Sequence, residues 1–302
     1  MKIRFISLLV AIALAWPATA QINIWEGTSC KARTVTLTAV LPEGEPVASI
    51  IVCPGGSYYW HDTESEGIAV ANWLADNGIA AYILNYRVAG VADYLFAYRA
   101  ILRGNRHPDM ICDLQRSIEL VREQYDGPVG VMGFSAGGHL ALSSGSFAGT
   151  NFLERYDIEP EVSLVPDFIA AIYPVVTMSE EDIVHKRSRK GLMGRSRVHD
   201  KSLRDSLSLE QHVDSTMPPV FLVNCKDDDV VEYHNSELMD SALTAAGILH
   251  KRLLFETGGH GFGANPEKLN PETSEWQENF VPWLDTIVLR QKGHRIQFPI
   301  GD

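Results

Sequence analysis

The sequence predicts an α/β fold in which a mostly parallel sheet is covered by helices on both faces. Two observations point to this class. Short apolar runs typical of buried strands alternate along the chain with segments whose apolar residues recur at helical spacing. Glycines and prolines stand between many of these segments. Such alternation favours parallel strands joined by crossover helices, because both faces of a parallel sheet need cover.

The predicted elements follow in chain order. Residues 34–40 alternate as a half-exposed strand, and the other expected strands are short apolar runs at 48–53, 79–85, 128–132, 168–173, 219–223 and 251–255. Helices are expected at 67–77, 110–124, 235–246 and 271–290. Gly78 and Gly247 suit the C-terminal ends of the first and third of these helices, and Pro282 predicts a kink in the last.

The first twenty residues predict a secretory signal peptide. Lys2 and Arg4 make a basic start, residues 5–16 are apolar but too short to span a bilayer comfortably, and Ala18-Thr19-Ala20 fits a cleavage site. We therefore expect the mature chain to begin at Gln21, to act in a periplasm or outside the cell, and to lack membrane attachment after cleavage.

The remaining residues, 21–302, are expected to form a single catalytic domain. The polar stretch 178–217 interrupts the alternation and predicts a partial cap over the site. The formal net charge of −12 argues against nucleic-acid binding, because an acidic surface repels phosphates. One segment of this acidic chain, residues 185–204, is basic. It is expected to be a solvent-exposed surface segment, and the alternative is that it holds an acidic substrate.

Four cysteines, Cys30, Cys53, Cys112 and Cys225, match no zinc spacing. Export would allow disulfides. Cys53 and Cys225 end apolar strands, where a small buried thiol fits, so mostly free and buried thiols are favoured.

Residues 133–138, with the sequence GFSAGG, follow an apolar run and open into a predicted helix. A G-x-S-x-G between a strand and a helix is typical of a nucleophile elbow, in which a strained turn exposes the serine hydroxyl. Ser135 is therefore the candidate nucleophile. The alternative is a chance match in a glycine-containing loop.

A serine hydroxyl needs a base to accept its proton, and the base needs an orienting acid. His260 lies in a glycine-rich loop, residues 258–263, after the last predicted strand, and is the candidate base. His139 adjoins the elbow, but it lies inside a predicted helix where packing or local bonding is the more usual role.

The acid is expected in residues 226–231, KDDDVV, after the strand that ends at Cys225. Asp227 comes first off the strand and is favoured, with Asp228 as the alternative. The other carboxylates of the run suit turn formation and helix capping.

The oxyanion of a tetrahedral intermediate needs backbone N–H donors. Ala136 follows the nucleophile and supplies one. Residues 54–58, PGGSY, follow an earlier strand and place Gly56 and Ser57 as the others. The aromatic residues beside this loop, Tyr58 and Trp60 in particular, either line the substrate pocket or pack under the cap.

Taken together, these segments resemble the secreted bacterial acetyl esterase branch of the α/β-hydrolases, often called acetylxylan esterases. The segments that match lie at 53–58, 66–67, 85–87, 133–141, 227–231 and 258–263. The resemblance implies the α/β-hydrolase fold, a Ser-His-Asp triad and Asp227 as its acid. Ser57 stands where relatives often carry a third glycine, and Glu232 stands where they carry proline.

The resemblance also implies deacetylation of sugars or xylan-type oligosaccharides, although relatives cleave feruloyl and simple aliphatic esters too. Such chemistry requires no metal or organic cofactor. Two other functions are the alternatives: a serine peptidase of the prolyl oligopeptidase type, and a hydrolase-fold binding protein without catalysis. The first usually has a large extra domain, and the second would normally have lost a triad residue.

Overall fold

The computed structural model describes residues 21–96 and 104–286. The predicted signal peptide, residues 1–20, lies outside the described residues. Eight strands form one sheet in the order β1-β2-β4-β3-β5-β6-β7-β8. Their bounds are β1 (Gln21–Asn23), β2 (Thr36–Val40), β3 (Ala48–Cys53), β4 (Ile79–Asn85), β5 (Val129–Phe134), β6 (Phe168–Ile172), β7 (Val220–Cys225) and β8 (His250–Phe255).

The sheet is parallel from β4 to β8, and only β1 and β2 pair antiparallel with their neighbours. The mostly parallel sheet of the prediction is therefore confirmed. Every predicted strand is present within about two residues of its expected bounds. The three-residue strand β1 was not predicted, because so short an edge segment carries no periodic signal.

The predicted helices correspond to α1, α3, α7 and α8, and a further helix, α4, follows the elbow. The helices are α1 (Ala69–Asp76), α2 (Val91–Phe96), α3 (Asp109–Arg122), α4 (Ala136–Ser146), α5 (Lys186–Met193), α6 (Lys201–Ser206), α7 (His234–Ala245) and α8 (Pro271–Leu284). Short π-helical and 3₁₀ turns complete the set: η1 (Glu64–Ile68), η2 (Phe152–Tyr156) and η3 (Leu209–His212). Residues beyond 286, at the end of the predicted last helix, lie outside the described residues.

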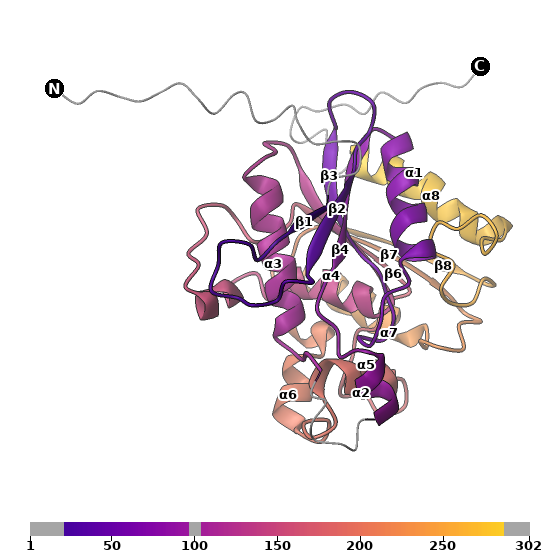
Figure 1. Ribbon diagram of the computed structural model, residues 1–302. Coiled ribbons are helices and arrows are strands. Elements are labelled where there is room, and N and C mark those ends of the chain that lie inside the picture. The colour runs from indigo at the N-terminus through magenta and orange to yellow at the C-terminus, as the bar shows by residue number, and fades with distance from the viewer. Residues whose placement is uncertain (1–20, 97–103, 287–302) are drawn as a thin grey trace.

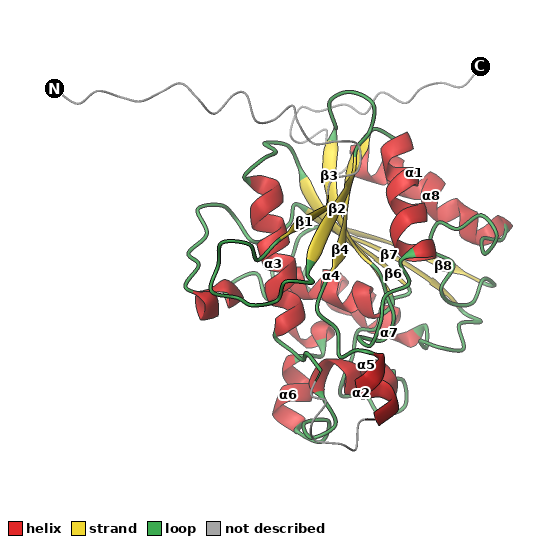
Figure 2. Ribbon diagram, in the orientation of Figure 1, coloured by secondary structure: helices red, strands yellow, loops and turns green. Residues whose placement is uncertain are grey.

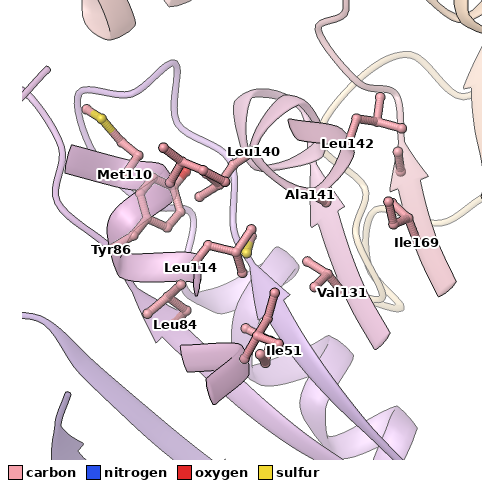
Figure 3. Packing of buried hydrophobic residues seen from close by; sticks show 14 of the residues in the cluster. Ile51, Leu84, Tyr86, Met110, Leu114, Val131, Leu140, Ala141, Leu142 and Ile169 are labelled. Atoms are coloured by element: carbon pink, nitrogen blue, oxygen red, sulfur yellow. The ribbon is translucent and has the colours of Figure 1, made fainter. Parts of the chain in front are cut away.

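The helices divide between the two faces of the sheet (Figure 2). Alternate side chains of each buried strand join different core clusters, so that Ile51 of β3 faces α3 and α4, whereas Ile50 faces α1 and α8. Figure 3 shows the first of these clusters, where Ile51 and Val131 of the sheet lie near Leu114 of α3 and Leu140 of α4. Both faces are therefore covered, as a parallel sheet requires.

Residues 178–217, the predicted cap, form α5, α6 and η3. The helices α2, α5 and α6 gather at one end of the molecule, below the sheet in Figure 1. Within the described residues, no helix combines the length and apolarity that crossing a bilayer requires. All four cysteines are free and buried, in agreement with the prediction of mostly free, buried thiols.

Candidate active site

Ser135 occupies a strained turn between β5 and α4. Its φ is 53° and its ψ is −117°, a conformation that is unusual for a residue with a side chain. The Ser135 N–H donates to the carbonyl of Ile172 at 3.0 Å, which fixes the turn against β6. Only 5% of the residue is exposed. The predicted elbow geometry is therefore present.

The glycines of the elbow are required by close backbone packing. A Cβ at Gly133 would lie 2.0 Å from the carbonyl oxygen of Gly137. A Cβ at Gly137 would lie 2.0 Å from the carbonyl oxygen of Cys53, at the end of β3. Both distances are far inside van der Waals contact. The G-x-S-x-G pattern thus has a steric cause, since the start of α4 presses on two neighbouring strands.

His260 lies between Ser135 and an aspartate. Its Nε2 is 2.9 Å from Ser135 Oγ, and its Nδ1 is 2.7 Å from Asp228 Oδ2. With Nδ1 donating to the carboxylate, Nε2 is free to accept the serine O–H. The three side chains come from the loops after β5, β7 and β8, at the carboxyl edge of the sheet. This is the arrangement that nucleophilic catalysis by serine requires.

The preference for Asp227 as the partner of His260 is wrong, because the structure puts Asp228 there. Asp227 instead accepts hydrogen bonds from the backbone N–H groups of Gly258 at 3.1 Å and Gly259 at 2.8 Å. The side chain of Asp228 is almost fully buried, and its second oxygen accepts from the N–H of Val230 at 2.9 Å. The turn after β7 thus directs one carboxylate to the loop backbone and the next into the site.

The rejected base, His139, is part of the core. Its Nδ1 is 2.8 Å from the Tyr58 hydroxyl, and its Nε2 is 2.9 Å from the carbonyl oxygen of Leu207. Burial lowers the pKa of His139 to about 4, so its ring is neutral at physiological pH. His139 therefore has the packing and hydrogen-bonding role that was expected for a histidine inside this helix.

The loop after β3 lies directly beside the nucleophile. A Cβ at Gly55 would be 2.9 Å from Ser135 Cβ. Within the described residues, the N–H groups of Gly56 and Ser57 donate to no acceptor in the protein, which leaves them free for a ligand. Ala136 is the first residue of α4, where an N–H has no partner inside the helix. The predicted oxyanion donors are thus unpaired, and two of them belong to a loop that touches the serine.

A buried carboxyl, Glu66, connects this loop to the histidine loop. Its Oε2 accepts from Gly55 N–H at 2.6 Å, and its Oε1 accepts from the Tyr173 hydroxyl at 2.9 Å. The same hydroxyl oxygen accepts from Gly263 N–H at 2.9 Å. Burial raises the pKa of Glu66 to about 7, while the nearby His260 and the Gly55 N–H oppose this rise.

Sequence reasoning did not assign a role to Glu66 or Tyr173. Tyr173 has φ 39°, and its ring lies 4.6 Å from the His260 ring, centroid to centroid. Glu66 stands among polar residues at the start of a helix, where a glutamate is usually solvated. No local pattern marks it as buried, because its partners lie 11 and 107 residues away.

The two aromatic residues predicted to contact substrate have different surroundings. Tyr58 is fully buried in the core and its hydroxyl is bonded to His139, so the prediction that it lines the pocket is wrong. Trp60 is half-buried, and the Arg187 guanidinium lies over its ring at 5.5 Å from the centroid. Trp60 therefore remains a candidate for substrate contact.

Residues 21–96 and 104–286 contain no group of three or more His, Cys, Asp or Glu side chains that could hold a metal ion. The expectation that no cofactor is needed stays a prediction.

The chain is similar to known ester hydrolases. The model of the BD-FAE family matches residues 40–243. An acetylxylan esterase from Xylanibacter ruminicola is 28% identical over 279 residues, which cover 88% of this chain and 52% of that protein. The chain thus spans about half the length of this relative.

Two solved structures have the same fold. An acetyl ester-xyloside bifunctional hydrolase from Caldicellulosiruptor lactoaceticus is 30% identical with a TM-score of 0.74, covering 90% of this chain and 97% of that chain. A carboxylesterase from Lactobacillus plantarum is 19% identical with a TM-score of 0.68, covering 91% and 97%. These likenesses confirm the predicted α/β-hydrolase fold.

Proposed function

The chain belongs to the BD-FAE family and groups with carboxylic ester hydrolases of the acetylxylan esterase type, and we propose that it is a serine carboxylesterase. Its proposed reaction removes acetyl or similar small acyl groups from sugars or xylan-type oligosaccharides. The observation that carries the proposal is the continuous hydrogen-bonded chain from Ser135 through His260 to Asp228, with distances of 2.9 and 2.7 Å.

In the proposed mechanism, Ser135 Oγ attacks the ester carbonyl carbon while His260 Nε2 takes the hydroxyl proton. The resulting tetrahedral intermediate collapses, the C–O bond to the sugar breaks, and His260 returns the proton to the leaving alcohol. Water, activated by His260, then attacks the acyl-serine ester and releases the acid. Asp228 holds the imidazole in the productive tautomer. These steps use no metal or organic cofactor.

The carbonyl oxygen becomes an oxyanion, and its proposed donors are the N–H groups of Gly56, Ser57 and Ala136. Two observations support this assignment: Gly55 lies against Ser135, and Ala136 lies at the N-terminus of α4. A helix N-terminus carries partial positive charge, so it stabilises the negative charge as it forms.

The sugar ester is proposed from the similarity to the acetylxylan esterase and to the acetyl ester-xyloside hydrolase. Export is proposed with it, because residues 1–20 have the composition of a signal peptide and a polysaccharide is encountered outside the cytoplasm.

The test is a Ser135→Ala variant assayed for acetate release from acetylated xylan, beside butyryl, feruloyl and peptide substrates. We expect the wild type to release acetate and the variant to lose at least about a thousandfold in kcat. A fluorophosphonate probe should label the wild type at Ser135 and leave the variant unlabelled. Unchanged acetate release by the variant would reject the proposal, and preferential cleavage of the peptides would replace it with a peptidase.

A further inference from the structure

Helix α5 of the cap packs on the loop that carries two of the proposed oxyanion donors. A Cβ at Gly191 would lie 2.3 Å from the carbonyl oxygen of Ser57 and 2.9 Å from Tyr58 Cβ. Only a glycine allows the helix to approach so closely. A Cβ at Gly55 of the same loop would lie 2.9 Å from Ser135 Cβ, so α5 packs on the loop that lies beside the reacting serine.

Arg187, in this first turn, is held by two contacts with that loop. Its Nε–H donates to Ser57 Oγ at 3.0 Å, and its guanidinium lies over the Trp60 ring at 5.5 Å from the centroid. Stacking on an aromatic face and one hydrogen bond fix the plane of the guanidinium. Its two Nη atoms remain, with four N–H donors between them.

The Nη atoms of Arg187 have no acceptor among the described residues. No carboxylate of residues 21–96 or 104–286 forms an ion pair with Arg187, whereas Arg189 and Arg204 of the same cap segment both pair with Glu181. The Nη atoms are also not among the buried unpaired polar atoms of this part of the chain, so solvent reaches them. Arg187 thus presents an open, oriented pair of donors.

The neighbouring His185 does not compete for an anion. Burial, together with the nearby Arg187 and His260, lowers the pKa of His185 to about 4, although Asp228 opposes this shift, so the ring is neutral at physiological pH. Of these two neighbours, Arg187 is therefore the one that carries a positive charge for an anion to meet.

We propose that Arg187, supported by Trp60, binds a carboxylate carried by the alcohol part of the ester substrate. A planar guanidinium end with two parallel N–H donors matches a carboxylate in bidentate geometry. The inference rests on the proposed function, because an acetyl group has no second charge and the anion must belong to the sugar. The substrate class is an acetylated oligosaccharide bearing a uronic acid.

The experiment compares two acetylated xylo-oligosaccharides, one with a uronic acid branch and one with the same branch converted to its primary amide. Acetate release is measured at low and high salt for the full chain. We expect the wild type to favour the acid in kcat/KM by roughly tenfold at low salt, about the value of one charge-assisted pair at a partly exposed site. The preference should shrink as salt screens the pair.

Three variants separate substrate binding from loop support. Arg187→Gln should bring the acid-to-amide ratio to about one while kcat/KM for the amide stays within about twofold. Lys190→Gln removes a positive charge from the exposed side of the same helix and should leave the ratio as in the wild type. Ser57→Ala removes the acceptor of the Arg187 Nε–H but keeps the Ser57 backbone N–H, so its activity on the amide measures how much this bond supports the loop.

Equal kcat/KM values of the wild type for the acid and the amide would overturn the inference. So would equal losses on both substrates in Arg187→Gln, matched by Ser57→Ala, since that would make Arg187 a support of the oxyanion loop. If neither oligosaccharide is deacetylated while 4-nitrophenyl acetate is still cleaved, the proposed sugar substrate is rejected together with this inference. Acetate release without the carboxylate preference rejects this inference alone.

Discussion

His260 Nδ1 lies 2.7 Å from Asp228 Oδ2, while the adjacent carboxylate of Asp227 binds the backbone that leads to His260. Two neighbouring aspartates thus act on one histidine in different ways. Asp228 orients the imidazole ring itself. Asp227 fixes the two glycine N–H groups just before the ring, so it determines where the loop stands.

Asp228→Asn should therefore impair the chemistry far more than Asp227→Asn. An amide in place of the orienting carboxylate favours the wrong imidazole tautomer, so kcat should fall by roughly a thousandfold to ten-thousandfold. Asp227→Asn should lower kcat by less than about tenfold and destabilise the fold by about 1 kcal/mol through weaker loop bonds. Turnover of 4-nitrophenyl acetate and urea unfolding of each variant measure the two effects. The reverse order would return Asp227 to the role of triad acid.

Glu66 should make the stability of the protein fall as pH rises. Its pKa is about 7 in the fold, compared with an ordinary value of 4.5, and burial is the main cause. Between these values the folded protein keeps a proton that the unfolded chain has lost, so stability declines with pH. The stability contribution is fully present below pH 4.5 and is lost as pH passes through about 7.

Glu66→Gln removes this titration. Between pH 4.5 and 7.5, the free energy of unfolding of the wild type relative to the variant should fall by about 3 kcal/mol. Taking the difference between the two proteins cancels every other group that titrates in the same range. Urea unfolding at half-unit pH steps gives the measurement. A difference that is flat across the range would show that Glu66 does not titrate there.

Gly137→Ala should destabilise the protein and inactivate it. The new methyl group would meet the carbonyl oxygen of Cys53 at 2.0 Å, and neither backbone can move without disturbing β3 or the elbow. A loss of about 3 kcal/mol or more is expected from such overpacking. Gly149→Ala is the matched control, because nothing lies within 4 Å of its added Cβ. Thermal unfolding compares the two, and equal midpoints would contradict the steric account.

Tyr58→Phe should lower stability without changing KM. The Leu207 carbonyl can only accept, so His139 Nε2 donates to it and Nδ1 accepts from the Tyr58 hydroxyl. Losing that hydroxyl leaves a buried nitrogen unpaired, at a cost of about 1–3 kcal/mol. Unfolding experiments and steady-state kinetics separate the outcomes. A raised KM with unchanged stability would indicate substrate contact at Tyr58 after all.

Local sequence patterns predicted the parts of the site that depend on local sterics. The glycines around Ser135 are a backbone requirement, so they appear as a short pattern, and the place of His260 follows from the order of strands. The choice between Asp227 and Asp228 depends on the direction of one turn. Adjacent aspartates have the same propensities, so the sequence could not separate them.

The remaining features of the site depend on contacts between distant segments. Glu66 meets Tyr173 across 107 residues, and Arg187 meets Ser57 across 130. Residues 178–217, which carry Arg187, form short helices, one of them only six residues long, with little periodicity to detect. Propensity does not report such pairings, whereas the buried strands, whose apolar runs are continuous, were predicted closely.

The position of β8 at the open end of the sheet has a consequence for how the enzyme can fail. The proposed nucleophile stands after β5, in the middle of the sheet, but its base follows β8, which pairs with β7 alone among the described strands. Edge strands with partly exposed residues open more readily than central ones. Detachment of this single strand would withdraw His260 from Ser135 while the other seven strands remain in place, so activity would be lost before the rest of the sheet opens.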